Sequence, residues 1–192
     1  MSTGKRQRGA TLVELVIFIV VVGTAVIGVL TVLDLSTKSS ADPMVQKQAL
    51  AVAEAVLEEA QLQPFTYCDP DDASAATALG AADCTGGANG PSDESRLPLG
   101  PEAGETRTGA ATPFDNVSDY NGLVIGPGIT DLSGAAIAGL GAYTATVAVA
   151  NQALGAVPAA DSLLITVTVT GPGDTTVVLN GYRLRYAPNA LP

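Results

Sequence analysis

The sequence predicts an α+β fold in which a long N-terminal helix packs on a C-terminal antiparallel β-sheet. Three observations support this fold class: an apolar run near the N-terminus, a following segment of helix-forming residues, and segments of alternating polarity near the C-terminus. A chain of 192 residues has room for one compact domain and one further element. We therefore expect a single globular head attached to a long helix.

The apolar run covers residues 10–33 and reads ATLVELVIFIVVVGTAVIGVLTVL. At about 1.5 Å per residue, a helix of this length crosses a hydrocarbon core about 30 Å thick. A secretory signal peptide would have a shorter apolar core, of about 7 to 15 residues. Cations precede the run and an acid, Asp34, follows it, which places the N-terminus in the cytoplasm and the rest of the chain outside. The preceding cations are Lys5, Arg6 and Arg8.

A second helical segment is expected at residues 44–62, which read MVQKQALAVAEAVLEEAQL and consist largely of strong helix formers. Its apolar residues recur at three-to-four spacing and predict one buried face. Asp42 can cap this segment and Pro43 can open it, so we expect a kink or short break between the two helical halves. The predicted buried face contains Leu50, Ala53, Leu57 and Ala60.

The clearest strand signals lie near the C-terminus, where residues 142–150 (AYTATVAVA) and 162–170 (SLLITVTVT) alternate with period two. Residues 171–174 (GPGD) predict a turn into a third strand at residues 175–186, with Gly181 as a bulge. Together these segments predict a three-stranded antiparallel sheet with one buried face.

Between the helix and the strands, residues 63–141 are rich in Gly, Ala, Pro, Ser and Asp and predict loops with short elements. Cys68 and Cys84 are the only cysteines, and both lie on the exported side of the membrane helix. We predict that they form a disulfide, the alternative being two unpaired thiols. Closing a loop of this size stabilises a folded chain by about 3 kcal/mol in the chain-entropy model.

Composition argues against catalysis and against nucleic-acid binding. The chain contains no histidine, the commonest general base and metal ligand, and its residue spacing gives no sign of a catalytic carboxylate pair or lysine. We predict no catalytic residue and no cofactor. A net charge of −10 repels phosphate backbones, and the close basic pair outside the first nine residues is Arg183 with Arg185.

Two groups of oxygen-bearing side chains are calcium candidates, because calcium takes oxygen ligands. One lies beside the cysteines, and the other lies in FDNVSDYNG at residues 114–122. Neither matches the D-x-[DN]-x-[DN]-G loop with its distal glutamate, and acidic surface loops are common in an acidic protein, so the sequence does not assign a metal site. The first group is Asp69, Asp71, Asp72 and Asp83; the second is Asp115, Asn116, Asp119 and Asn121.

Glu14 is the one acidic residue of the apolar run. A carboxylate costs on the order of 2 to 3 kcal/mol at the centre of a bilayer. Glu14 therefore either reaches the headgroup water near the cytoplasmic interface or has a partner inside the apolar layer.

Residues 8–15 (RGATLVEL) resemble the prepilin signature of the type IV pilin-like family: a basic leader ending in glycine, followed by an apolar stretch with glutamate at its fifth position. The resemblance implies that a prepilin peptidase cleaves after Gly9 and methylates the new amine of Ala10. The family more often has phenylalanine at that position. The resemblance further implies that Glu14 pairs with the N-terminal amine of a neighbouring subunit during fibre assembly.

Residues 34–44, 47–72 and 114–122 resemble minor pilins of the mannose-sensitive haemagglutinin (MSHA) type, the MshD group. This resemblance implies a pilin-like fold and a low-abundance structural subunit that primes or caps a type IV pilus. Its implied partners are the prepilin peptidase, other pilin subunits, the pilus assembly platform and the inner membrane. Two alternatives remain: a minor pseudopilin of a type II secretion system, and a pilus-tip adhesin or binding module. An adhesin that binds its ligand by stacking needs exposed aromatic side chains. The chain has only 3 Phe, 5 Tyr and no Trp, which argues against this alternative.

The expected organisation has five parts. It comprises a removed basic leader at 1–9, a transmembrane and assembly helix at 10–33, an amphipathic continuation at 34–62, a loop-rich segment with the disulfide at 63–141 and an antiparallel sheet at 142–192. The expected location is the inner membrane, with a cytoplasmic N-terminus and a periplasmic head, and afterwards a pilus at the cell surface.

Overall fold

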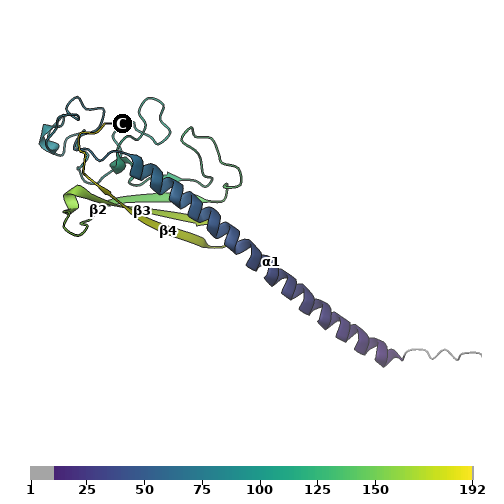
Figure 1. Cartoon of the computed structure of the whole chain (residues 1–192). Coiled ribbons are helices and arrows are strands. Elements are labelled where there is room, and N and C mark those ends of the chain that lie inside the picture. The colour runs from purple at the N-terminus through teal and green to yellow at the C-terminus, as the bar shows by residue number, and fades with distance from the viewer. Residues whose placement is uncertain (1–10, 192) are drawn as a thin grey trace, which may run out of the picture. The chain divides into compact units, whose positions relative to one another are not determined.

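The computed structural model describes residues 11–191, and the side chains of these residues apart from 34–42 (Figure 1). The predicted leader and Ala10 lie outside the described residues. The chain divides into two compact units, Met1–Met44 and Val45–Pro192, which are described separately. We call the second unit the head. Both units contribute to one helix, α1, which runs from Leu12 to Leu62.

In the first unit, the segment Leu12–Leu33 of α1 is apolar apart from Glu14 and two threonines. Its residues Leu12–Leu33 are long and apolar enough to cross a membrane, with a mean hydropathy of 2.9, and every side chain from Thr11 to Leu33 is exposed. The hydroxyl of Thr24 donates to the carbonyl of Val21 at 3.0 Å, and that of Thr31 donates to the carbonyl of Ile27 at 2.9 Å. Both hydroxyls are therefore hydrogen-bonded within their own helix and need no partner from the apolar surroundings.

The predicted break before residue 44 is wrong. Helix α1 continues through this region, with Pro43 inside it. Proline removes one backbone hydrogen bond and disfavours a helix interior by about 3 kcal/mol. The strong helix formers that follow Pro43, and the packing of their buried face in the head, offset this cost.

The head contains a four-stranded antiparallel sheet in the order β1-β2-β3-β4, of which Figure 1 labels β2, β3 and β4. Its strands are β1 (Val124–Ile125), β2 (Thr144–Asn151), β3 (Ser162–Gly171) and β4 (Thr175–Leu184). The three predicted strands are confirmed, whereas the two-residue strand β1 was not predicted. Short 3₁₀ helices occupy Ala81–Asp83 and Val117–Tyr120, so the segment before β2 consists of loops with short elements, as expected, and a third 3₁₀ helix, Ala159–Asp161, lies between β2 and β3.

Gly181 does not form the predicted bulge, because β3 and β4 pair in continuous register, with Gly181 opposite Ile165. The glycine serves close packing instead. A Cβ atom at this position would lie 2.4 Å from Nε2 of Gln61 and 3.0 Å from Cδ1 of Leu57, both on α1. The absence of a side chain therefore lets the helix approach the strand.

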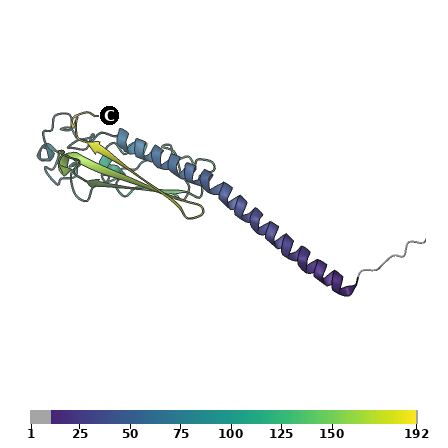
Figure 2. The same ribbon diagram turned by 60° about the horizontal axis from the view of Figure 1, so that its bottom comes forward.

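The core of the head lies between α1 and one face of the sheet (Figure 2). The four apolar residues that share one face of β3 point into this core, and all of them are fully buried. The helix face is only partly as predicted: Ala53 and Ala60 are buried and Leu57 is half-buried, but Leu50 is exposed. Alanines bring the helix close to the sheet, and valines fill the remaining space. The buried residues are Leu163, Ile165, Val167 and Val169 of β3, and Ala49, Val52, Ala53, Val56 and Ala60 of α1.

Candidate functional site

The start of α1 gives Glu14 a local structural position. The backbone N–H of Glu14 donates to Oγ1 of Thr11 at 3.2 Å, and the N–H of Leu15 donates to the carbonyl of Thr11 at 3.1 Å. Thr11 is therefore the N-cap, and Glu14 is the third residue of the helix, where a carboxylate is favoured by the helix dipole. The Glu14 side chain is exposed. The predicted processing residues, Gly9 and Ala10, lie outside the described residues.

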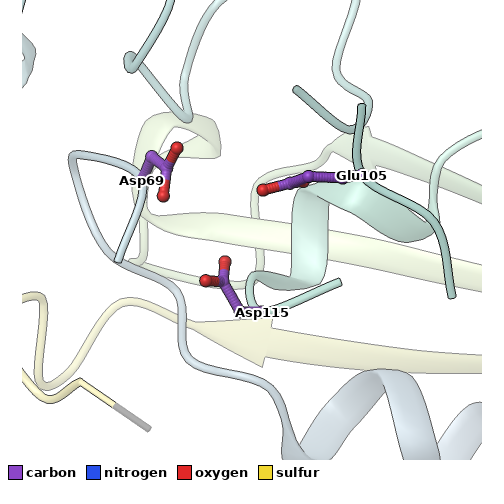
Figure 3. A group of neighbouring side chains, drawn as sticks. All are labelled: Asp69, Glu105 and Asp115. Carbon is purple, nitrogen blue, oxygen red and sulfur yellow. The ribbon is translucent and has the colours of Figure 1, made fainter. Parts of the chain in front are cut away.

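The head holds a cluster of six carboxylates that arrives from separate loops. One group, which we call the outer triad, is Asp69, Glu105 and Asp115 (Figure 3). The other, which we call the inner triad, is Glu94, Glu102 and Asp119. Within each triad, one oxygen from each residue lies within 4.8 Å of the others. This grouping joins members of both calcium candidate groups and adds three glutamates that the sequence analysis did not single out.

The inner triad is the more deeply buried of the two. Glu94 is 3% exposed and Asp119 is fully buried. One oxygen of each has donors: Oε2 of Glu94 accepts the Ser118 hydroxyl, and Oδ2 of Asp119 accepts the backbone N–H groups of Asn116 at 2.8 Å and Asp115 at 3.1 Å. The remaining oxygens, Oε1 of Glu94 and Oδ1 of Asp119, are buried and accept no hydrogen bond from the described residues. Oε2 of Glu102 is likewise buried and accepts no hydrogen bond from the described residues.

The outer triad is half-buried. Oδ1 of Asp69 accepts the N–H of Asp71 at 2.7 Å, and Oε2 of Glu105 accepts the N–H of Glu102 at 3.2 Å. Oδ1 of Asp115 is buried and accepts no hydrogen bond from the described residues. Both triads therefore contain buried carboxylate oxygens whose interaction capacity is unused, and such oxygens are destabilising unless something else compensates for their lost hydration.

Burial and mutual repulsion make the ionised cluster unfavourable. Burial raises the pKa of Asp119 to about 8, with a further rise from the charges of Glu105 and Glu102 and an opposing effect of the backbone hydrogen bond from Asn116. Burial, followed by the charge of Asp119, raises the pKa of Glu94 well above its usual range. In the outer triad, burial and neighbouring carboxylates raise the pKa values of Asp115 and Glu105 to about 7. Full ionisation of the cluster at neutral pH is therefore unfavourable, and either protons or a bound cation would relieve the repulsion.

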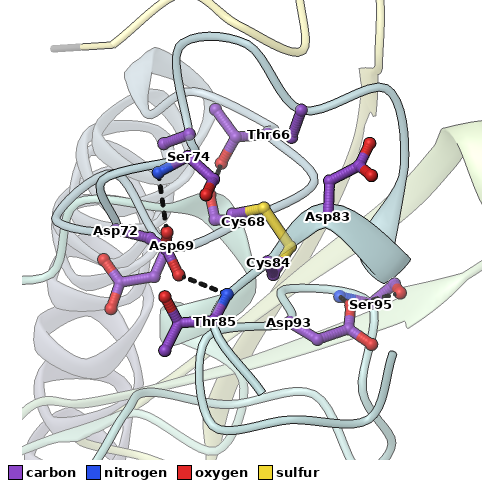
Figure 4. Close-up of a disulfide and its surroundings, with 12 residues drawn as sticks. Thr66, Cys68, Asp69, Asp72, Ser74, Asp83, Cys84, Thr85, Asp93 and Ser95 are labelled. Carbon is purple, nitrogen blue, oxygen red and sulfur yellow. Dashed lines mark hydrogen bonds between the residues drawn. A yellow bond between two sulfur atoms is a disulfide. The ribbon is translucent and has the colours of Figure 1, made fainter. Parts of the chain in front are cut away.

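Backbone pairing and the disulfide bring the first two segments of the cluster together. Cys68 and Cys84 form the predicted disulfide, with an S–S distance of 2.05 Å (Figure 4). Beside it, the N–H of Asp69 donates to the carbonyl of Ser92 at 3.0 Å, and the N–H of Glu94 donates to the carbonyl of Tyr67 at 3.1 Å. This short antiparallel pairing sets Asp69 and Glu94 on adjacent backbones.

A second set of contacts fixes the segment that carries Asp115 and Asp119. Asn116 caps the 3₁₀ helix Val117–Tyr120 in a capping box with Asp119. The Nδ2 group of Asn116 donates to Oγ1 of Thr66 at 2.6 Å, and the N–H of Val117 donates to the carbonyl of Pro64 at 3.1 Å. The helix is thereby anchored to the chain just before Cys68.

The other calcium candidates have different surroundings. Oδ1 of Asp72 accepts the N–H of Ser74 at 2.8 Å, and its Oδ2 accepts the N–H of Thr85 at 2.7 Å, so this carboxylate supports the disulfide loop (Figure 4). Oδ2 of Asp83 accepts the N–H of Leu79 at 2.8 Å. Asp71 is exposed and belongs to neither triad. Asn121 bridges Leu99 and Val149 through its amide.

An apolar groove of about 740 Å³ runs beside α1 in the head, with a lining that includes Val52, Val56, Ile129, Leu132 and Ile137. Glu59 and Arg107 also line it and form a bidentate ion pair, with both N···O distances at 2.7 Å. This ion pair ties α1 to the loops that form the opposite side of the groove.

Comparison of the chain with family models, with curated proteins and with solved structures finds no match.

Proposed function

We propose that the chain is a pilin-type structural subunit, a minor pilin of an MSHA-like type IV pilus, anchored in the inner membrane and assembled through its N-terminal helix. The observation that carries the proposal is the helix segment Leu12–Leu33, which is exposed on all sides and contains a single carboxylate, five residues after Gly9. Such a surface needs either lipid or other apolar helices around it. Assembly into a fibre would replace the surrounding lipid with the apolar helices of other subunits.

The head supports the same function. Residues Val45–Leu62 of α1 pack on one face of the antiparallel sheet, so that one helix has a segment for the membrane and another for the core. A structural role does not require catalytic groups, and the carboxylates of the head lie in a cluster that is constrained by loops. We therefore assign no reaction to the protein.

Processing is the first step to test. The chain is co-expressed with and without a prepilin peptidase in a bacterium that lacks one, and the mature N-terminus is determined by mass spectrometry. Cleavage after Gly9 and a methylated amine on Ala10, both dependent on the peptidase, are the expected results. An intact first residue in both strains would mean that the chain is an ordinary single-pass membrane protein.

Assembly depends on the charge of Glu14 in this proposal. Glu14→Gln retains the shape of the side chain but loses the charge, and we expect normal cleavage without incorporation into fibres. Thr11→Val is the matched control, because it removes the N-cap hydroxyl, at a cost of about 1 kcal/mol to the helix, but keeps the carboxylate. Its incorporation should be close to that of the wild type. Equal loss in both variants would show that Glu14 acts by starting the helix and not by pairing with an amine.

Two alternatives remain. A minor pseudopilin of a type II secretion system would be processed in the same way but would assemble with secretion proteins. Co-purification with either pilus or secretion components distinguishes the two. A binding module is favoured by one observation, the apolar groove beside Val52 and Val56. For this function, substitutions in the groove would abolish adhesion of piliated cells without reducing the number of pili.

A further inference from the structure

We propose that the head binds a calcium ion through the inner triad of Glu94, Glu102 and Asp119, with the outer triad adjoining it. This site is additional to the proposed assembly function and does not depend on it. The proposal rests on the geometry of the triad and on its buried oxygens that accept no hydrogen bond from the described residues.

The spacing of the inner triad fits one ion. Three oxygens that are evenly spaced around one calcium ion at about 2.4 Å lie about 4.2 Å apart. One oxygen from each of the three residues lies within 4.8 Å of the other two. A single cation placed among them can therefore contact all three carboxylates with little rearrangement.

The free oxygens are a second, independent observation. Glu94 and Asp119 are each more than nine-tenths buried, and each has one oxygen held by donors and one without any among the described residues. The held oxygens fix the orientation of both carboxylates. A cation would supply at once the interactions that Oε1 of Glu94, Oε2 of Glu102 and Oδ1 of Asp119 lack.

The charge of the surroundings also favours a cation. Asp69 and Glu105 of the outer triad add to the negative field at Glu94 and Asp119. Burial raises the pKa of Glu102 and the charge of Arg96 opposes this rise, but that arginine is exposed. The Arg107 guanidinium is held by Glu59 and by the carbonyls of Thr130 and Asp131. A divalent ion would neutralise most of the charge of the inner triad without a proton on each carboxylate.

Calcium fits the ligand chemistry better than other common ions do. The ligands are all oxygens, and they come from separate loops with irregular geometry, which calcium accepts in its flexible shell of six to eight ligands. Magnesium requires a nearly ideal octahedron and retains water. Zinc prefers nitrogen and sulfur, but the chain has no histidine and its two cysteines form the disulfide.

Binding would cross-link loops that few regular elements connect. Glu94 is paired with Tyr67 through its backbone N–H, Glu102 lies in a loop, and Asp119 lies in the 3₁₀ helix Val117–Tyr120. An ion shared by these residues holds three segments together on the face that also carries the disulfide. We therefore expect calcium to raise the thermal stability of the head.

The test uses the full chain in detergent, stripped of metal with EDTA and then titrated with calcium chloride or magnesium chloride. Heat of binding is measured by titration calorimetry, and unfolding is followed by tyrosine fluorescence. At a free calcium concentration about a hundred times the Kd, we expect Tm to rise by about 5 to 10 °C. Magnesium at the same concentration should produce a much smaller rise. A folded wild type that neither binds calcium nor changes its Tm would overturn the proposal, and an equal response to magnesium would overturn the choice of calcium.

Matched variants locate the site. Glu94→Gln and Asp119→Asn retain the accepting oxygen and the shape but lose one ligand charge, so we expect the calcium-dependent rise in Tm to disappear. In EDTA their Tm should equal or exceed that of the wild type, because each removes a buried negative charge, and this result also shows that the variants fold. Asp174→Asn, at the exposed turn before β4, is the control and should keep the full response. Retention of the response in Glu94→Gln with loss in Asp115→Asn would place the ion in the outer triad and refute the assignment.

Discussion

The ion pair between Glu59 and Arg107 should be one of the strongest single links between α1 and the loops. Both side chains are largely buried, at 8% exposure for Arg107 and 15% for Glu59. Arg107 also donates to the carbonyls of Thr130 at 3.1 Å and Asp131 at 3.3 Å, and the Tyr120 hydroxyl donates to Glu59 at 2.9 Å. Glu59 raises the pKa of Arg107 further, so the guanidinium stays charged.

Removing the Arg107 side chain should therefore leave the Glu59 carboxylate buried without its counter-ion. Breaking one side of a buried pair costs about 3 to 5 kcal/mol, so Arg107→Ala should lower the free energy of unfolding by that amount. Glu59→Gln should have a smaller effect, about 2 kcal/mol, because its amide oxygen can still accept the Tyr120 hydroxyl. In the double variant the two losses should overlap, with a coupling energy of about 1.5 to 3 kcal/mol.

The measurement is denaturant unfolding of the full chain in detergent, followed by tyrosine fluorescence. All five tyrosines follow residue 62 and the chain has no tryptophan, so the signal reports on the head and not on the apolar segment Leu12–Leu33. Arg96→Ala, at an exposed arginine, is the control and should change the free energy by less than about 0.5 kcal/mol. Additive effects of Glu59→Gln and Arg107→Ala, within about 0.5 kcal/mol, would refute the coupling.

Two further predictions use the same assay. Cys68→Ala with Cys84→Ala should lower the free energy of unfolding by about 3 kcal/mol, and dithiothreitol should then have no additional effect; an unchanged midpoint would show that the loop is held without the disulfide. Gly181→Ala should destabilise the head by about 1 kcal/mol, because its Cβ would lie 2.4 Å from Nε2 of Gln61. Adding Gln61→Ala should recover most of that loss, and failure to recover it would locate the strain at Leu57 instead.

The strands could be predicted from the sequence because their alternation is local. Leu163, Ile165, Val167 and Val169 occupy every second position, and all four are fully buried. The buried face of α1 was harder to define, since alanine fits both a buried and an exposed position. The sequence pattern selected Leu50, but the sheet is contacted by the smaller Ala49, whose size allows the close approach. Strand β1 has two residues, too few to show a period.

The carboxylate cluster could be predicted only in part, because its members meet through long-range pairing. Asp69, Asp115 and Asp119 were candidates because each lies in a dense group of oxygen-bearing residues. Glu94 and Glu102 lie singly in loops, and only the pairing of residues 67–69 with 92–94 and the fold of the following loop bring them in. No spacing rule applies to such a site, because its ligands come from several separate segments of the chain.

Three features with different physical causes favour the same side of the membrane for the head. The cations Lys5, Arg6 and Arg8 before the apolar segment favour a cytoplasmic N-terminus. The disulfide needs an oxidising compartment. A cluster of six carboxylates that binds calcium is filled most readily where that ion is abundant, as it is outside the cytoplasm. Because the disulfide and the proposed ion both stabilise the same loops, a head retained in the cytoplasm would lose both supports. If both proposals hold, export would be a condition for a stable head as well as for assembly.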